Sequence, residues 1–167
     1  MLQKMMVVLG YCYDITRYYH SIKEAGMKIA IGADHRGFDH KEYIKHQMHH
    51  ITWVDVGAYT SERSDYPFFA HAVVQQMFQY DILYGILLCG TGIGMAITAN
   101  RYPGIYAALA WNNIVAQQSR QDDNSNILVI PSDYVIQEDA CIMIEDWLKT
   151  AFLEERYRER LMMIDMQ

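Results

Sequence analysis

Cysteine and proline are scarce in this sequence, which has only three of each among its 167 residues. Cys12, Cys89 and Cys141 are widely spaced and odd in number, so they match neither a disulfide framework nor a zinc site built from paired cysteines. We therefore expect a cytoplasmic protein with reduced thiols and no metal site.

An excess of positive charge and long apolar runs are lacking as well. The net charge of −6 argues against the basic surface that binds nucleic acids. No apolar run approaches the length of a membrane-spanning helix, and the segment Met5 to Tyr13 lacks the cleavage site of a signal peptide. We expect no nucleic-acid partner, no membrane partner and no export.

What is present is the composition of one globular domain, with 51% hydrophobic and 20% charged residues. Residues 1–26 differ from the rest because their hydrophobic periodicity is weak. We interpret them as an N-terminal extension, either a helical segment or sequence upstream of a true initiator at Met27. Residues 27–167 are then a single domain.

From Lys28 onward, short apolar runs alternate with longer amphipathic segments, which is the pattern of a parallel sheet covered by helices. Strands are predicted at Lys28–Ala33, Thr52–Val56, Tyr84–Cys89, Ile105–Ala110 and Asn126–Ile130. Helices are predicted at Phe38–His50, Asp65–Gln79, Ile93–Tyr102, Asn112–Gln121, Val135–Lys149 and Glu154–Met163. The fold class is α/β: a three-layer α/β/α sandwich with a five-stranded, parallel, doubly wound sheet and an extra C-terminal helix.

Polar motifs lie next to the predicted strands. The segments GADHRG (32–37), SERSDYP (61–67) and CGTGIG (89–94) follow the first three strands, and SRQDDN (119–124) precedes the fifth. Ligands of open parallel sheets bind beyond the carboxyl ends of the strands. We therefore expect these four motifs to converge on that edge.

The glycine-rich turn after the third strand can bring backbone amides close to an anion. It does not match a dinucleotide fingerprint, which would require glycine at Met95, and no P-loop lysine follows it. Cys89 stands beside these amides at a helix start. We expect this position to lower its thiol pKa and to favour a reactive thiolate.

These motifs, together with NSNILV after SRQ, resemble the ribose-5-phosphate isomerase B family, which includes allose-6-phosphate isomerases and galactose-6-phosphate isomerase subunits. The resemblance runs from Met27 to about Leu161. It implies a five-stranded parallel α/β sandwich that forms homodimers or homotetramers with shared active sites. It also implies an aldose–ketose isomerase that interconverts ribose 5-phosphate and ribulose 5-phosphate, in the pentose phosphate route, through an enediolate and without a cofactor.

The same resemblance assigns the reacting groups to the glycine-rich turn. Cys89 would be the catalytic base, which moves a proton between carbons two and one, and Thr91 would assist it. The backbone amides around Gly90, Gly92 and Gly94 would stabilise the enediolate oxygen.

Other residues would hold the substrate. The resemblance implies that Asp34 contacts substrate hydroxyls and that Tyr66 lines the pocket. His35 would bind the phosphate together with Arg156 and Arg160, which are one helical turn apart.

Two departures from the family pattern concern charge. Asp122 and Asp123 stand where the family has a histidine and an asparagine, and Asp133 replaces a common arginine. Asp122 can still exchange protons during ring opening, whereas Asp123 would place a carboxylate near an anionic intermediate. Two alternatives therefore stay open, an isomerase of a six-carbon sugar phosphate and a noncatalytic phosphosugar-binding paralogue.

Histidines at 46, 49 and 50 cluster near the end of the first predicted helix. Their spacing lacks the paired ligands on one helix face, with a distant third, that catalytic zinc requires. We interpret them as solvated helix residues.

Overall fold

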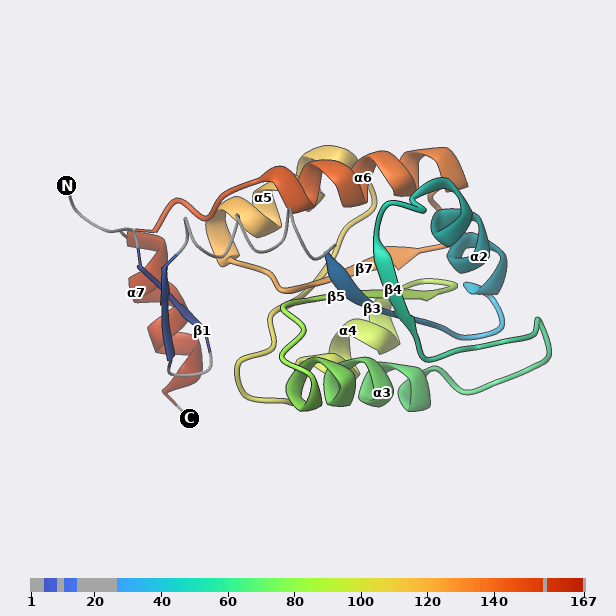
Figure 1. Ribbon diagram of the computed structural model, residues 1–167, viewed down its shortest axis with the longest axis horizontal. Coiled ribbons are helices and arrows are strands. Elements are labelled where there is room, and N and C mark those ends of the chain that lie inside the picture. The colour runs from blue at the N-terminus through green and yellow to red at the C-terminus, as the bar shows by residue number, and fades with distance from the viewer. Residues whose placement is uncertain (1–4, 9–10, 15–26, 155, 167) are drawn as a thin grey trace.

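A five-stranded parallel sheet forms the centre of the computed structural model (Figure 1), which describes residues 5–8, 11–14, 27–154 and 156–166. Its strands are β3 (Lys28–Ala33), β4 (Thr52–Asp55), β5 (Tyr84–Cys89), β6 (Ala107–Leu109) and β7 (Ile127–Pro131). They lie in the order β4-β3-β5-β7-β6, and every neighbouring pair is parallel. The predicted fold class is confirmed.

All five predicted strands are found, but the edge strand β6 is shorter than predicted. The amide of Tyr106 donates to the side chain of Asn126 at 2.8 Å, and the side chain of Asn100 bonds to both the N–H and the carbonyl of Ala107 at 2.8 Å. The Asn126 side chain takes up a backbone group that the sheet ladder would otherwise use, whereas Asn100 bonds to Ala107 within the strand. Residues 105 and 106 therefore lie outside the strand.

Six helices of the described chain cover or extend this sheet: α2 (Phe38–Gln47), α3 (Tyr66–Gln79), α4 (Ile93–Ala99), α5 (Asn113–Asp123), α6 (Gln137–Lys149) and α7 (Arg156–Asp165). The predicted helices ended too late in α2 and α4, and too early in α5 and α7. Asn112 caps the start of α5 by accepting a hydrogen bond from Val115 N at 2.9 Å. At the other end Asn124 adopts φ = 49°, which stops the helix.

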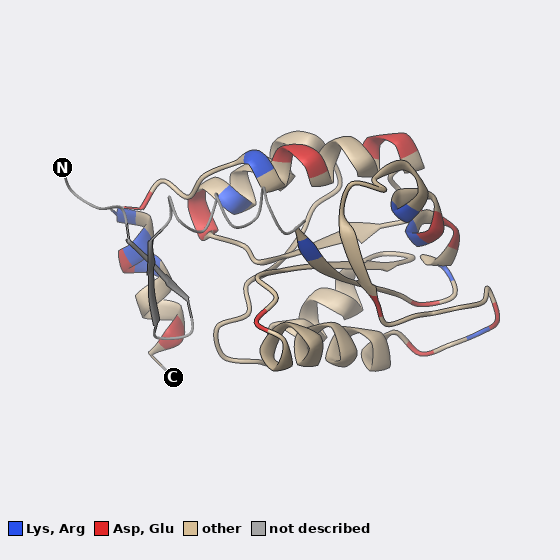
Figure 2. Ribbon diagram, in the orientation of Figure 1, with Lys and Arg blue, Asp and Glu red and all other residues tan. Residues whose placement is uncertain are grey.

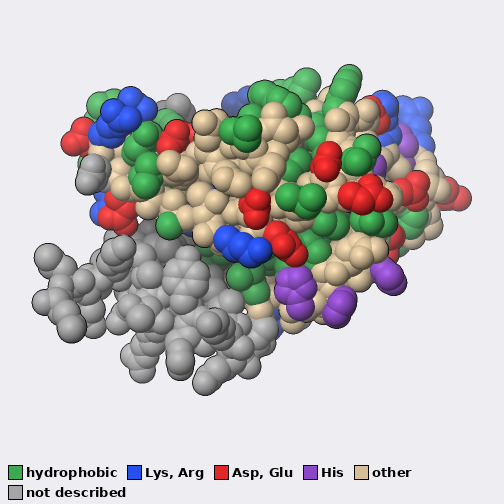
Figure 3. Space-filling view, turned by 90° about the horizontal axis from the view of Figure 1, so that it is seen from above, with side chains coloured by type: hydrophobic (Ala, Val, Ile, Leu, Met, Phe, Trp, Pro, Cys, Tyr) green, Lys and Arg blue, Asp and Glu red, His purple; other side chains and the backbone are tan. Residues whose placement is uncertain are grey.

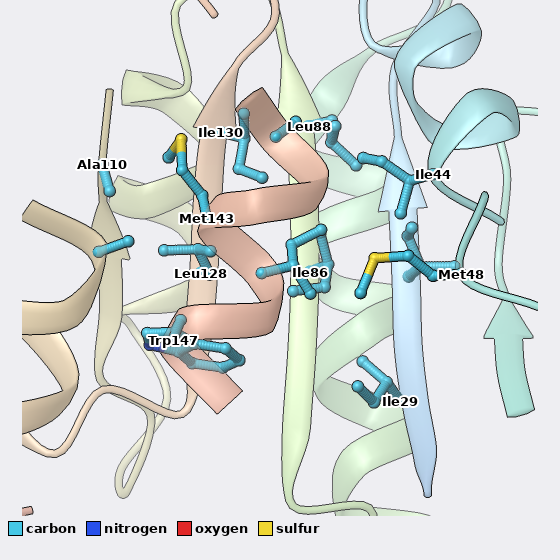
Figure 4. Packing of buried hydrophobic residues seen from close by; sticks show 14 of the residues in the cluster. Ile29, Ile44, Met48, Ile86, Leu88, Ala110, Leu128, Ile130, Met143 and Trp147 are labelled. Carbon is cyan, nitrogen blue, oxygen red and sulfur yellow. The ribbon is translucent and has the colours of Figure 1, made fainter. Parts of the chain in front are cut away.

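Successive side chains of each strand point to opposite faces of the sheet, so the core is divided between two helical layers. Ile29, Ile86 and Leu128 pack against α2, α5 and α6, whereas Ala30 and Leu87 face α3 and α4. Figure 4 shows the first cluster, in which Trp147 and Met143 of α6 lie over β5 and β7. Trp147 is fully buried, and its indole N–H donates to Ser125 Oγ at 2.8 Å. Both faces of the sheet are therefore covered, as the continuous apolar strands predicted.

The N-terminal extension contains two short strands, β1 (Met5–Val8) and β2 (Tyr11–Asp14), paired antiparallel. A helix at these residues, one of the two interpretations from sequence, is wrong. The rest of that interpretation, residues 1–4, 9–10 and 15–26, lies outside the described residues. The division of the chain at Met27 stays a prediction.

Charge is distributed unevenly between the two helical layers. Helices α3 and α4 contain no Lys, Arg, Asp or Glu, as Figure 2 shows, yet they expose Phe68, Phe78, Ile93 and Ile97. The face seen from the side of α6 carries side chains of both signs, with histidines gathered toward one end (Figure 3). In the described part of the chain, no helix is long and apolar enough to cross a membrane.

Candidate active site

The carboxyl ends of β3 and β5 lie side by side at the centre of the sheet. From β3 the chain goes outward to β4 on one side, and β5 lies on the other side of β3. Such a reversal opens a crevice between the loops that follow the two strands. Asp34 follows β3 and Cys89 ends β5, so the structure brings two of the predicted site residues together.

The turn after β3 is held by the carboxylate of Asp34, which is only 5% exposed. Its Oδ1 accepts hydrogen bonds from Arg36 N at 2.9 Å and Gly37 N at 3.1 Å, and its own amide donates to Leu88 O at 3.1 Å. A side chain at Gly37 would bring a Cβ within 2.6 Å of that same carbonyl. Glycine therefore allows the turn to pack directly against β5.

Cys89 is buried on the α3 and α4 side of the sheet, and its Sγ accepts a hydrogen bond from Gly92 N at 3.1 Å. Burial raises the pKa of this thiol, and the nearby Asp34 carboxylate raises it further, against the lowering effect of the amides of Gly92, Met95 and Thr91. The net shift is upward. The predicted lowering of the Cys89 pKa is wrong, because desolvation outweighs the amide donors.

Two glycines of the turn, Gly92 and Gly94, have different reasons for lacking a side chain. Gly92 has φ = 74°, a left-handed conformation that other residues rarely adopt. A Cβ at Gly94 would lie 2.5 Å from Cζ of Tyr66, so this glycine lets the Tyr66 ring lie directly over the turn. Thr91 is exposed at the tip of the turn.

His35 is oriented by the loop between β4 and α3. Its amide donates to Ser64 Oγ at 3.0 Å, and its ring Nδ1 lies 3.1 Å from Ser64 O and 3.3 Å from Ser64 N. These contacts use one ring nitrogen. Nε2 has no hydrogen-bond partner among the described residues, so it is available to a ligand.

Asp122 and Asp123 do not join this group within one chain. Helix α5 runs back from the carboxyl edge, so its last residues lie at the amino edge, shortly before β7 begins. The prediction that all four polar motifs converge on one edge is therefore wrong for the single chain. The reason is that parallel strands require each crossover helix to return to the opposite edge.

Arg156 and Arg160 also lie on the amino-edge side, on helix α7 (Figure 1). Burial raises the pKa of the Asp123 carboxyl, the neighbouring Asp122 raises it further, and Arg160 opposes both effects. Asp123 is thus easier to protonate than an ordinary carboxyl, which reduces its repulsion of an anion. The guanidinium groups of Arg156 and Arg160 both lie over the ring of Tyr157.

The position of α7 depends on contacts that local sequence did not indicate. Leu153 N donates to Gln121 O at 3.0 Å, Leu161 is buried, and Tyr106 donates from its hydroxyl to Asp165 Oδ2 at 2.5 Å. The last contact joins residues 59 apart. No local sequence pattern indicates such a contact.

The sequence also did not indicate how the charged residues near Cys89 pair. Arg36 and Asp133 form an ion pair across the end of β5, although the sequence suggested only that Asp133 removes a positive contact. Among the described residues, no group of three His, Cys, Asp or Glu side chains is arranged to hold a metal ion. The site therefore offers a thiol, a buried carboxylate, backbone amides and an imidazole, a set suited to proton transfer on a polar substrate.

Comparison with known proteins gives consistent results. The sequence profile described as Ribose/Galactose Isomerase matches residues 29–164. Ribose-5-phosphate isomerase B of Escherichia coli is 37% identical over 136 residues, which are 80% of this chain and 91% of that protein.

Solved structures agree with this result. A ribose 5-phosphate isomerase of Thermotoga maritima superposes with a TM-score of 0.82 and 41% identity, covering 84% of this chain and 99% of that one. The ribose-5-phosphate isomerase B of Mycoplasma genitalium, solved with bound ribulose-5-phosphate, gives a TM-score of 0.77 and 34% identity, over 83% of this chain and 94% of that one.

Proposed function

The chain belongs to the ribose/galactose isomerase family, and from this premise we propose that it interconverts ribose 5-phosphate and ribulose 5-phosphate. The observation that carries the proposal is the position of Cys89. Its sulfur lies in a turn of backbone amides at the end of β5, beside the buried carboxylate at the end of β3. A base next to N–H donors is what an enediolate mechanism requires.

In the proposed reaction Cys89, as thiolate, removes the proton from carbon two of the open-chain aldose. The electron pair moves toward the carbonyl oxygen, and the amides of the Gly90–Gly94 turn stabilise the resulting enediolate. The thiol then returns its proton to carbon one, while the hydroxyl proton moves from oxygen two to oxygen one with help from Thr91. Because the Cys89 pKa is raised, only a small fraction is thiolate at neutral pH, and this fraction increases with pH.

Residues around this turn would hold the substrate. We assign the hydroxyl contacts to Asp34, the pocket wall to Tyr66 and a phosphate contact to His35. His35 supports the assignment because its Nδ1 is held by Ser64 and its Nε2 is available. Tyr66 supports it by lying over Gly94.

We propose that the site is completed by a second copy of the chain. Asp122, Asp123, Arg156 and Arg160 lie at the amino edge, so a single copy cannot bring them to its own Cys89. The uncharged layer of α3 and α4, with its exposed Phe68, is a suitable surface for a homodimer, because burying it desolvates no charge. In that assembly the partner's α5 and α7 would supply the phosphate-binding arginines and the proton exchange of Asp122.

To test whether the active site is shared between two chains, two variants expected to be inactive, Cys89→Ala and Arg160→Ala, are expressed separately and together. With shared sites, some mixed dimers contain one site with both residues intact, so co-expression restores activity. Sites confined to one chain would leave the mixture as inactive as its parts.

The primary experiment is conversion of ribose 5-phosphate to ribulose 5-phosphate by the purified protein, with Cys89→Ala and Cys141→Ala as matched variants. We expect activity in the wild type and in Cys141→Ala, whose thiol is half-buried on α6, and its loss in Cys89→Ala. Activity that survives in Cys89→Ala would refute the assigned base.

The same assay separates the two alternatives left open by sequence. Activity only on allose 6-phosphate or galactose 6-phosphate would favour the six-carbon substrate. No turnover of any of these, with activity gained in the double variant Asp122→His with Asp123→Asn, would favour the noncatalytic paralogue.

A further inference from the structure

Arg36 and Asp133 meet beside the glycine-rich turn of the candidate site. Arg36 belongs to the turn after β3 and Asp133 to the loop after β7, 97 residues later. The ion pair joins Nη2 of Arg36 to Oδ2 of Asp133. It therefore connects the loops on either side of β5, the strand that ends in Cys89.

The pair rests directly on the glycine-rich turn. A Cβ at Gly90 would lie 2.6 Å from Nε of Arg36 and 2.8 Å from Oδ2 of Asp133, so any larger residue would displace the pair. Asp133 N also donates to Gly90 O at 3.0 Å, and Ser132 N donates to Cys89 O at 2.9 Å. The guanidinium is thus held one residue away from the proposed base.

As a contribution to stability this pair is weak. The Arg36 side chain is 55% exposed and that of Asp133 30% exposed, and pairs of this kind contribute about 0–1 kcal/mol. Arg36 donates from Nη2 alone, and its other guanidinium N–H groups have no partner among the described residues. One carboxylate fixes the orientation of this arginine. The remaining N–H groups of its planar guanidinium can therefore bind a second anion.

The two lysines of α2 are engaged elsewhere. Lys41 and Lys45 both bind Asp55 and Glu42, and Lys41 is completely buried. Among the described residues, Arg36 is a cation whose side chain lies against the glycine-rich turn. A doubly charged phosphate attracts it more strongly than a single carboxylate does.

We propose that Arg36 binds the phosphate of the sugar-phosphate substrate and that Asp133 is a positioning residue, which orients the guanidinium over Gly90. This assignment rests on the proposed function, since it identifies a further substrate contact of the same site. It gives each chain a phosphate-binding guanidinium at its own carboxyl edge, in addition to those on α7.

The test compares Arg36→Gln with Arg101→Gln, a control that removes an exposed arginine just after the end of α4, at the opposite edge. Binding of inorganic phosphate is measured by calorimetry, and KM and kcat are measured with ribose 5-phosphate. Loss of a charge-assisted contact should weaken phosphate binding and raise KM by about 10- to 100-fold in Arg36→Gln, with a smaller change in kcat. Arg36→Lys should recover part of this loss, because it keeps the charge without the fork.

Two outcomes would overturn the proposal. Equal phosphate affinity in Arg36→Gln and Arg101→Gln would remove Arg36 from the binding site. Tighter phosphate binding in Asp133→Asn would show that Asp133 competes with the ligand, whereas weaker binding supports its positioning role. Because calorimetry needs no turnover, a wild type that binds phosphate through Arg36 but lacks isomerase activity would refute the proposed function and leave this assignment standing.

Discussion

Replacing Lys41 by methionine should lower the free energy of unfolding of this protein by about 3 kcal/mol. The Lys41 side chain is fully buried and its Nζ lies 2.8 and 2.7 Å from the two carboxylate oxygens of Asp55. Methionine has a similar shape and no charge, so it leaves the partly buried Asp55 carboxylate with less compensation. Removing one partner of a buried pair typically costs about 3–5 kcal/mol, and we take the lower end because Lys45 still reaches Asp55 at 2.5 Å.

For a domain of this size, about 3 kcal/mol corresponds to a fall in Tm of roughly 6–12 °C. The assay is urea denaturation followed by circular dichroism, with Lys45→Met as the matched control. Lys45 is 26% exposed and its removal leaves the Lys41 pair intact, so the control should lose about 1 kcal/mol. A loss in Lys41→Met no larger than in Lys45→Met would refute the importance of the buried pair.

The effect should also depend on pH in a defined direction. Burial alone would raise the pKa of Asp55, but hydrogen bonds from Lys41, Lys45 and Gly57 lower it below its ordinary value. A lowered folded-state pKa gives stability that is present above the unfolded pKa and is lost as the pH falls through the folded value. The difference between wild type and Lys41→Met should thus be constant near neutral pH and shrink below about pH 4.

Three further predictions concern the site. Alkylation of Cys89 by iodoacetamide, with Cys12 and Cys141 replaced by serine, should have its midpoint above the ordinary thiol pKa of about 8.5, and a midpoint below it would contradict the dominance of burial. Tyr106→Phe removes the hydrogen bond to Asp165 on α7 and should raise KM while Tm falls by less than about 4 °C, so an unchanged KM would argue against a role of α7 in binding. Gly94→Ala should reduce kcat/KM at least about tenfold, because its methyl group must displace the Tyr66 ring, and full activity would show that this ring can move freely.

Secondary structure followed closely from sequence because strands buried on both faces are continuous apolar runs between amphipathic segments. The errors lie at the ends of elements, where single side chains decide. Asn126 takes the amide of Tyr106 away from β6, and Asn124 ends α5 in a left-handed conformation. Such endings depend on a side chain that finds its partner only in the folded chain.

The first half of the candidate site was also accessible from sequence. Asp34 and Cys89 each end a strand, and loops at strand ends of a parallel sheet share one edge. The expected convergence of SRQDDN with the other motifs was wrong for a single chain, because α5 carries Asp122 back to the amino edge. The direction of the Cys89 pKa was wrong because local amides can be read from a motif, whereas burial cannot.

The sequence by itself determined the layers of this protein, its local turns and the residue types available for chemistry, since each depends on residues close together in the chain. Only the tertiary structure decided the strand order, the burial of Cys89, the pairing of Arg36 with Asp133 and the docking of α7 through Tyr106. These features depend on contacts between residues far apart in the chain, whose geometry and desolvation exist only once the sheet has assembled.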